Sequence, residues 1–238
     1  MSNIAYNLDM TLTLQHIDQI RQCKLFATLS DSALNQIAGQ GYLVNLDTGQ
    51  TVFSQGDPSD RFYLVQRGLV KLYRLSVDGT EKVMDLVGPN QSFAESTMFS
   101  CKYPLHASAV EASVVFSFDS KNFMALMRDS VELCFSMMAS MSQRLHCSIN
   151  EIDQLTLRNG TQRLAEYLLE QVHDGEQLSS HIRLTAPKLV IASRLGIQPE
   201  TFSRILGRLR CSGMVEMHND TILLKDLNAL RGLATHPG

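Results

Sequence analysis

Side chains able to read base edges are concentrated in one short stretch, residues 183–210. Within it, Glu200, Ser203 and Arg204 combine acceptor, mixed and donor chemistry at a spacing that suits one helical face. Arg can donate two hydrogen bonds to guanine, Glu can accept one from cytosine, and Ser can do either. The stretch holds six Arg or Lys and one acid, although the whole chain has a net charge of −3. This pattern predicts contact with a polyanion.

Apolar spacing in the same stretch predicts the two helices that must position these side chains. Gly196 between them suits the positive φ that follows a helix, and Pro199 suits the first turn of the next one. The expected buried residues are Leu189, Ile191, Ala192 and Leu195 in the first helix, and Phe202, Ile205, Leu206 and Leu209 in the second. We therefore predict a helix-turn-helix whose second helix enters a DNA major groove.

The sequence Gln198-Pro199-Glu200-Thr201-Phe202-Ser203-Arg204 resembles the recognition helix of the Crp/Fnr regulators, in its Fnr-like branch. The resemblance implies that Glu200, Ser203 and Arg204 read a TTGAT half-site and its inverted partner ATCAA. It also implies RNA polymerase as a partner and transcription activation as the activity. The residues expected to contact the DNA backbone are Lys188, Gln198, Thr201 and Arg208.

Composition bounds the class of protein. The 238 residues are enough for about two domains, and no apolar run approaches the ~20 residues of a membrane span. The first ten residues lack the basic segment of a secretory signal. Five scattered cysteines without a C-x-x-C pair favour reduced thiols in the cytoplasm. No catalytic triad, metal cluster or phosphate-cradling loop indicates an enzyme.

The central part of the chain predicts a β-structure. Short apolar runs at 42–46, 51–53, 62–65, 69–75, 82–87 and 114–118 alternate with turn signals, which suggests a barrel or sandwich. The run from Gly49 through Gln55-Gly56-Asp57 to Gly68 and Tyr73 resembles the β-roll of the cyclic-nucleotide-binding fold. The expected fold is α+β, with N-terminal helices (1–41), a β-roll sensor domain (42–120), a long dimerisation helix (121–157) and a winged helix-turn-helix (158–238), whose wing is a hairpin in residues 213–224.

The expected ligand pocket departs from the cyclic-nucleotide pattern. Binders of that type carry a Gly-Glu pair and then an Arg that pairs with the phosphate, whereas this chain has Ala94-Glu95 and no Arg in the segment 104–108. A phosphate without a cationic partner binds poorly in a partly buried pocket, so we do not expect cyclic AMP. Glu95 is expected to cap a loop. The predicted effector pocket contains Ala94, Glu95, Met98 and His106.

The segment from 131 to 157 carries apolar residues at alternating steps of four and three, a heptad seam. A two-stranded coiled coil, and hence a homodimer, would place two recognition helices about one DNA turn apart. Phe135, Met137 and Ile149 lie off the seam and are expected to face the β-roll. The seam residues are Met138, Met141, Leu145, Ser148, Ile152 and Leu155, continuing from Cys134.

Within the family, four segments look most like the Dnr/Nnr-type members, which respond to nitric oxide through a bound haem and control nitrogen-oxide respiration. They are 43–47, 71–75, 92–99 and 197–204. The cysteine cluster of an iron–sulfur sensor is missing from the N-terminal region, so no such cluster is expected. The candidate haem ligands are Cys23, His16, His106 and His146. A different small-molecule effector, redox sensing through cysteines, and a ligand-binding module without DNA function remain alternatives.

Overall fold

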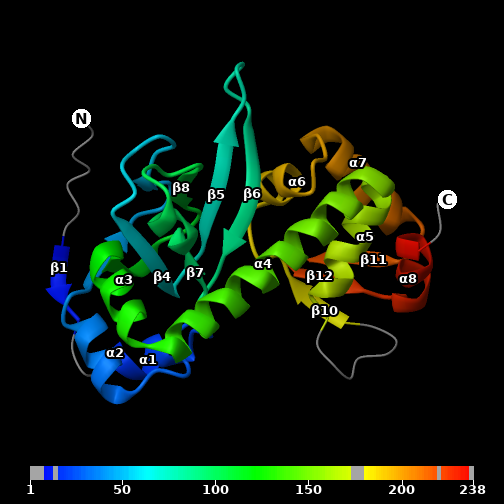
Figure 1. Ribbon diagram of the computed structural model, residues 1–238. Coiled ribbons are helices and arrows are strands. Elements are labelled where there is room, and N and C mark those ends of the chain that lie inside the picture. Colours follow the sequence, from blue (N-terminus) through cyan, green and yellow to red (C-terminus); the bar gives the residue numbers. More distant parts are fainter. Residues whose placement is uncertain (1–7, 13–15, 173–179, 219–220, 236–238) are drawn as a thin grey trace. The chain divides into compact units, whose positions relative to one another are not determined.

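The computed structural model describes residues 8–12, 16–172, 180–218 and 221–235 (Figure 1). The chain forms two compact units, Met1–His146 and Cys147–Gly238. Helix α4 (Val131–Leu157) contains the boundary between them. Among the described residues, none of the helices combines the length and the apolar character needed to cross a bilayer.

The first unit is built on two antiparallel sheets, as the strand spacing predicts. One sheet has the order β1 (Leu8–Thr11), β2 (Tyr42–Leu46), β9 (Ser113–Asp119), β4 (Arg61–Arg67) and β7 (Ser92–Phe93). The other has the order β3 (Thr51–Phe53), β8 (His106–Ala109), β5 (Val70–Leu75) and β6 (Glu81–Val87). The expected β-roll is confirmed. The pairing of β1 with β2 and the short strands β7 and β8 were not predicted, because only long-range pairing defines them.

The central strands β4 and β9 of the five-stranded sheet are buried on both faces, and the alternation of side chains along them separates two cores. In β4, Tyr63 and Val65 face the interior between the sheets, while Phe62 and Leu64 face the opposite side. The second side is covered by residues from the N-terminal helices, α3 and the first turns of α4. Strand β4 therefore has a continuous apolar run from Phe62 to Val65, without alternating polar residues.

Four shorter helical segments accompany the sheets: α1 (Ile17–Gln22), α2 (Asp31–Ala38), the 3-10 helix η2 (Glu95–Phe99) and α3 (Ser120–Asp129). Ser30 caps α2 by accepting a hydrogen bond from the Ala33 N–H, as predicted. The single long helix predicted from residue 121 is wrong. Ser130 is extended, with φ −133° and ψ 106°, and its hydroxyl accepts from the Leu133 N–H at 3.2 Å. A serine that caps a new helix ends α3 there.

The second unit is a winged helix-turn-helix. Its elements are α5 (Gly160–Glu170), β10 (Ser180–Arg183), α6 (Lys188–Arg194), α7 (Pro199–Cys211), β11 (Val215–His218), β12 (Thr221–Leu224) and α8 (Leu227–Thr235). The strands form a sheet in the order β10-β12-β11, which supplies the predicted wing hairpin. Helix α5 begins with a complete capping box between Asn159 and Gln162.

Candidate functional site

Helix α7 has the two-sided character that a groove-reading helix needs. Its buried residues are the four predicted ones, Phe202, Ile205, Leu206 and Leu209. Gln198 is the N-cap and Pro199 occupies the first turn. Gly196 has φ 62°, so the turn before the helix uses the left-handed backbone region that glycine favours. The apolar side holds the helix in the domain and leaves the opposite side for another molecule.

The three predicted base readers lie together on that opposite side. Glu200, Ser203 and Arg204 are all exposed, and their i, i+3, i+4 spacing places them on one stripe. Within the described part of the chain, neither Glu200 nor Arg204 has an ion pair. A free carboxylate and a free guanidinium can exchange hydrating water for base edges without first breaking an internal contact.

The predicted backbone contacts surround this stripe. Lys188 begins α6, Gln198 caps α7 and Arg208 lies one turn beyond Arg204, and all three are exposed. Thr201 is partly buried. The expected burial of Leu189 is wrong, because its side chain is 65% exposed. Ile191 and Ala192 bury the face of α6, and a residue two positions before Ile191 points to the far side of a helix with 3.6 residues per turn.

The predicted effector residues Ala94, Glu95 and Met98 lie together on the β7–η2 segment. Ala94 adopts the left-handed conformation, with φ 63° and ψ 8°, and its side chain contacts both cores of the first unit. A non-glycine residue there costs of order 1 kcal/mol and persists only where its surroundings fix it. Met98 is buried in the core beneath the N-terminal helices.

Glu95 does not only begin η2; it forms an ion pair that the sequence did not predict. Its side chain is 3% exposed, and its Oε1 lies 2.8 Å from Arg144 Nη2 on α4. The Ser92 hydroxyl donates to the same oxygen at 3.2 Å, and Arg144 also donates to the Ser92 carbonyl. Because the two partners are about fifty residues apart in the chain, no local signal indicated this pairing.

The interior of the β-roll is filled with apolar and aromatic side chains. The Phe53 and Tyr103 rings stack with centroids 3.8 Å apart, and Tyr63 stacks on Phe93 at 5.1 Å. Leu105, in the segment where cyclic-nucleotide binders carry an Arg, packs against this core. An apolar lining without that cation does not suit a phosphate.

The candidate haem ligands differ in their surroundings. Cys23 is 3% exposed in the core beneath the N-terminal helices, and burial raises the pKa of its thiol. His16 packs edge-on against Phe116, with ring centroids 5.6 Å apart. His146 is exposed on α4. His16 and Cys23 flank α1 as its N-cap and C-cap, whereas His106 lies on β8 and His146 on α4.

His106 lies apart from the other predicted pocket residues. Its neighbour Ala107 points into the β-roll core, so alternation along β8 directs His106 to the other face. There it stacks on Tyr73 with centroids 5.1 Å apart. Its Nδ1 accepts a hydrogen bond from the Gln55 N–H at 3.2 Å.

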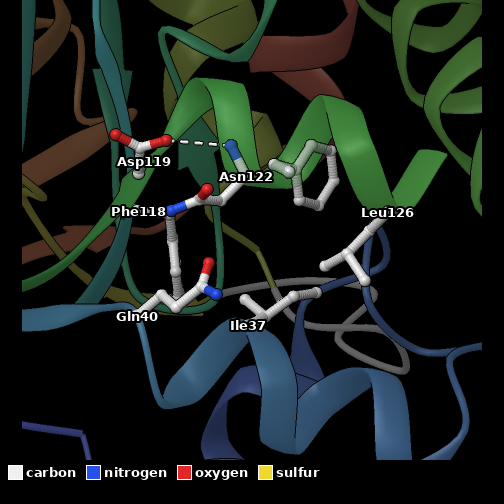
Figure 2. Close-up of a pocket in the computed structure, with 7 residues that line it drawn as sticks. Ile37, Gln40, Phe118, Asp119, Asn122 and Leu126 are labelled. Carbon is white, nitrogen blue, oxygen red and sulfur yellow. Dashed lines mark hydrogen bonds between the residues drawn. The ribbon is translucent and has the colours of Figure 1, made fainter. Parts of the chain in front are cut away.

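A small pocket lies between α2 and α3, as Figure 2 shows. Ile37, Phe118 and Leu126 contribute apolar surface, and Asp119 accepts from the Asn122 N–H at 2.8 Å. Its empty volume is about 190 Å³, including space open to solvent. This is below the range of typical ligand pockets, and none of the predicted effector residues lines it.

Helix α4 carries an exposed apolar stripe that differs from the predicted seam. Met138, Leu145, Ser148, Ile152 and Leu155 are exposed as a seam requires, but Met141 is partly buried against the core. Phe135 could face the β-roll according to its position off the seam, and this prediction is wrong. Phe135 is 64% exposed and Ile149 46%. Of the three residues expected to face inward, Met137 alone is buried. The exposed residues Phe135, Met138, Leu145, Ile149 and Ile152 fit a heptad pattern that keeps Met138, Leu145 and Ile152 of the predicted seam and moves its other series by one residue, to Phe135 and Ile149.

Comparison with known proteins agrees with these observations. Residues 43–130 match the cyclic nucleotide-binding domain, and residues 162–233 match the Crp-like helix-turn-helix domain. The chain is 35% identical to DNR from Pseudomonas aeruginosa, covering 94% of this chain and 99% of that one, with a TM-score of 0.52. It is 28% identical over 194 residues to the fumarate and nitrate reduction regulatory protein of Salmonella typhimurium, covering 80% of this chain and 78% of that protein.

A further relative is the CRP-like cAMP-activated global transcriptional regulator of Mycobacterium tuberculosis. It is 26% identical over 211 residues, which cover 87% of this chain and 94% of the relative. The fold and the helix-turn-helix thus define a DNA-binding regulator with an effector domain. The chain belongs to the Crp/Fnr family of transcription regulators. The relatives that it matches are transcription regulators and not enzymes.

Proposed function

We propose that this regulator acts as a homodimer on a TTGAT/ATCAA palindrome. The observation that carries the proposal is the stripe of Glu200, Ser203 and Arg204, exposed on α7 above a fully buried apolar face. Arg204 is assigned to guanine, because a guanidinium can donate two hydrogen bonds to that base. Glu200 is assigned to cytosine, because a carboxylate can accept a hydrogen bond from its amino group. Lys188, Gln198, Thr201 and Arg208 are assigned to the phosphate backbone, where they fix the register.

The dimer is proposed to form along the exposed stripe of α4. A palindrome needs two recognition helices related by a twofold axis, and a parallel pair of α4 helices supplies one. Phe135, Leu145 and Ile152 offer apolar surface to a second copy of the chain. Binding of an effector in the first unit would then shift the population of two dimer arrangements. RNA polymerase is the proposed partner at activated promoters.

For the effector we propose nitric oxide carried by haem, in control of nitrogen-oxide respiration. The support is the sequence resemblance to Dnr/Nnr-type members and the 35% identity to DNR. Cys23 fits a haem ligand poorly, because its thiol is buried in apolar surroundings that disfavour a thiolate. We therefore derive no step through haem. A Crp/Fnr regulator with another small-molecule or redox effector is the second candidate, favoured by this arrangement of the first unit.

Fluorescence anisotropy without oxygen tests both parts. The TTGAT/ATCAA palindrome is titrated with the protein alone, with haem, and with haem and nitric oxide, beside a duplex of scrambled half-sites. Preference for the palindrome in any state supports the DNA assignment, and equal affinity for both duplexes in every state contradicts it. Tight binding only with haem and nitric oxide supports the sensor assignment. Identical palindrome affinity in all three states rejects haem and nitric oxide while keeping the DNA assignment.

A further inference from the structure

One guanidinium in the second unit joins two helix ends that lie far apart in the sequence. Arg163, on the first turn of α5, donates from Nε to the Leu195 carbonyl at 2.8 Å and from Nη2 to the Gly196 carbonyl at 3.3 Å. Its Nη1 donates to the Arg158 carbonyl at 2.5 Å. Each of its three nitrogens therefore holds a main-chain oxygen.

These three carbonyls all lie at the C-terminal ends of helices. Arg158 directly follows the last residue of α4, and Leu195 and Gly196 directly follow α6. The C-terminal end of a helix leaves carbonyls without partners and carries partial negative charge, which a cation stabilises. Partial burial lowers the pKa of Arg163, yet a guanidinium stays protonated at neutral pH. One cation thus caps two helices at once.

The carbonyls of the second helix end lie in the turn that sets the start of α7. Leu195, Gly196 and Ile197 bond back into α6, to Ile191, Ser193 and Ala192 respectively. Gln198 then caps α7, and Glu200 follows four residues after Gly196. A displacement of this turn therefore moves the base-reading stripe almost directly.

The first turn of α5 is packed closely enough to transmit such a displacement. The capping box of Asn159 and Gln162 fixes where α5 begins after α4. A Cβ added at Gly160 would lie 3.4 Å from Ile205 on α7 and 3.6 Å from Ile197 in the turn. The backbone at the start of α5 therefore lies close to both the turn and the recognition helix.

We infer that Arg163 is a positioning residue that ties the end of α4 to the helix turn and so fixes the base readers relative to that end. Arg163 lies outside the set of DNA contacts, and the inference rests on the proposed DNA function. Lysine cannot replace it, because a single ammonium does not reproduce a fork of three nitrogens aimed at three fixed oxygens.

The test uses the full-length chain with Arg163→Lys and Arg163→Met, and with Arg231→Met as the matched control. Arg231 lies in the same unit on α8, is exposed, and its guanidinium donates to a local partner, Asn228, at 3.2 Å. Hydrogen exchange measured by mass spectrometry should rise together in peptides covering 154–158 and 195–198 in both Arg163 variants, and stay at the wild-type level in the control. A uniform rise over the whole second unit, or no rise, overturns the inference.

Operator binding provides the second readout. In both Arg163 variants, the ratio of affinity for the palindrome to affinity for the scrambled duplex should fall at least tenfold. Non-specific affinity and its salt dependence should stay unchanged, because no phosphate contact is removed. A parallel loss on both duplexes would contradict a positioning role. If the wild-type protein itself shows no preference, the proposed DNA function fails, and the exchange experiment still decides whether Arg163 joins the two helix ends.

Discussion

The recognition stripe of α7 and the β7–η2 segment of the first unit differ in how they use their polar side chains. Glu200, Ser203 and Arg204 lie within five consecutive residues and are exposed. Glu95, in contrast, is buried and already bonded to Ser92 and Arg144. A surface that reads DNA must leave its hydrogen-bonding groups available, while a segment that anchors a fold must satisfy them internally.

This difference indicates where DNA binding can be altered without loss of stability. Changes on the recognition stripe should affect binding and leave stability nearly constant. Changes in the β7–η2 segment should act first on stability. The following predictions test that separation, beginning with the largest expected effect.

Arg204→Ala should weaken binding to the palindrome by about 2–6 kcal/mol, since each of two half-sites loses a contact worth roughly 1–3 kcal/mol. Preference at the corresponding G·C pair should relax, and thermal stability should stay unchanged. Arg210→Ala is the matched control, because Arg210 is exposed on the same helix but off the stripe. Anisotropy with single base-pair changes measures both effects. An equal loss in the two variants would mean that charge alone supports binding.

Arg144→Met should destabilise the first unit by about 2 kcal/mol or more, because it leaves the buried Glu95 carboxylate without a cation. This figure allows for the partial exposure of the Arg144 side chain. The double variant Glu95→Gln/Arg144→Met should recover part of that loss, since it removes the unpaired charge. Thermal unfolding measures the cycle. Strictly additive losses would show that the two side chains are not coupled.

Phe135→Ser should raise the dimer dissociation constant about tenfold, roughly 1.4 kcal/mol, with little effect on the stability of the chain itself. Met141→Ser should show the opposite pattern, because Met141 packs partly against the core of the first unit. Sedimentation at several concentrations and thermal unfolding separate the two. Dissociation caused by Met141→Ser with intact stability would restore the seam predicted from the sequence.

The smallest effects are expected from two helical glycines, Gly207 and Gly232. A Cβ added at either position would have no neighbouring side chain of the described structure within 4 Å. Replacing either with Ala should stabilise the second unit by about 0.5–1 kcal/mol, since glycine is a poor helix former. Gly207 follows Arg204 by three residues on the recognition stripe, so its variant should also bind the palindrome less tightly. Gly232→Ala should leave binding unchanged. Equal affinities would show that DNA does not approach α7 closely at Gly207.

Much of the fold could be predicted because the relevant signals are local. Strands β2 and β3 have the predicted bounds, and the apolar stripe of α7 is the predicted one. Predictions failed where a long-range contact decided the outcome. Leu189 and Phe135 have helical spacing compatible with burial, yet both side chains are mostly exposed among the described residues. Ser130 is a further case, since its extended backbone and its hydroxyl, which caps the following turn, divide the one long helix that was predicted into α3 and α4.

The sequence by itself determined the base-reading chemistry, because Glu200, Ser203 and Arg204 need only one helix to bring them together. It also determined the absence of a cation in the 104–108 segment, which is a matter of residue type. Only the tertiary structure decided that Arg144 neutralises Glu95, that Arg163 caps two helices, and that His106 faces away from the β-roll core. Such pairings follow from chain topology, which places residues tens of positions apart within hydrogen-bond distance and leaves no periodic trace in the sequence.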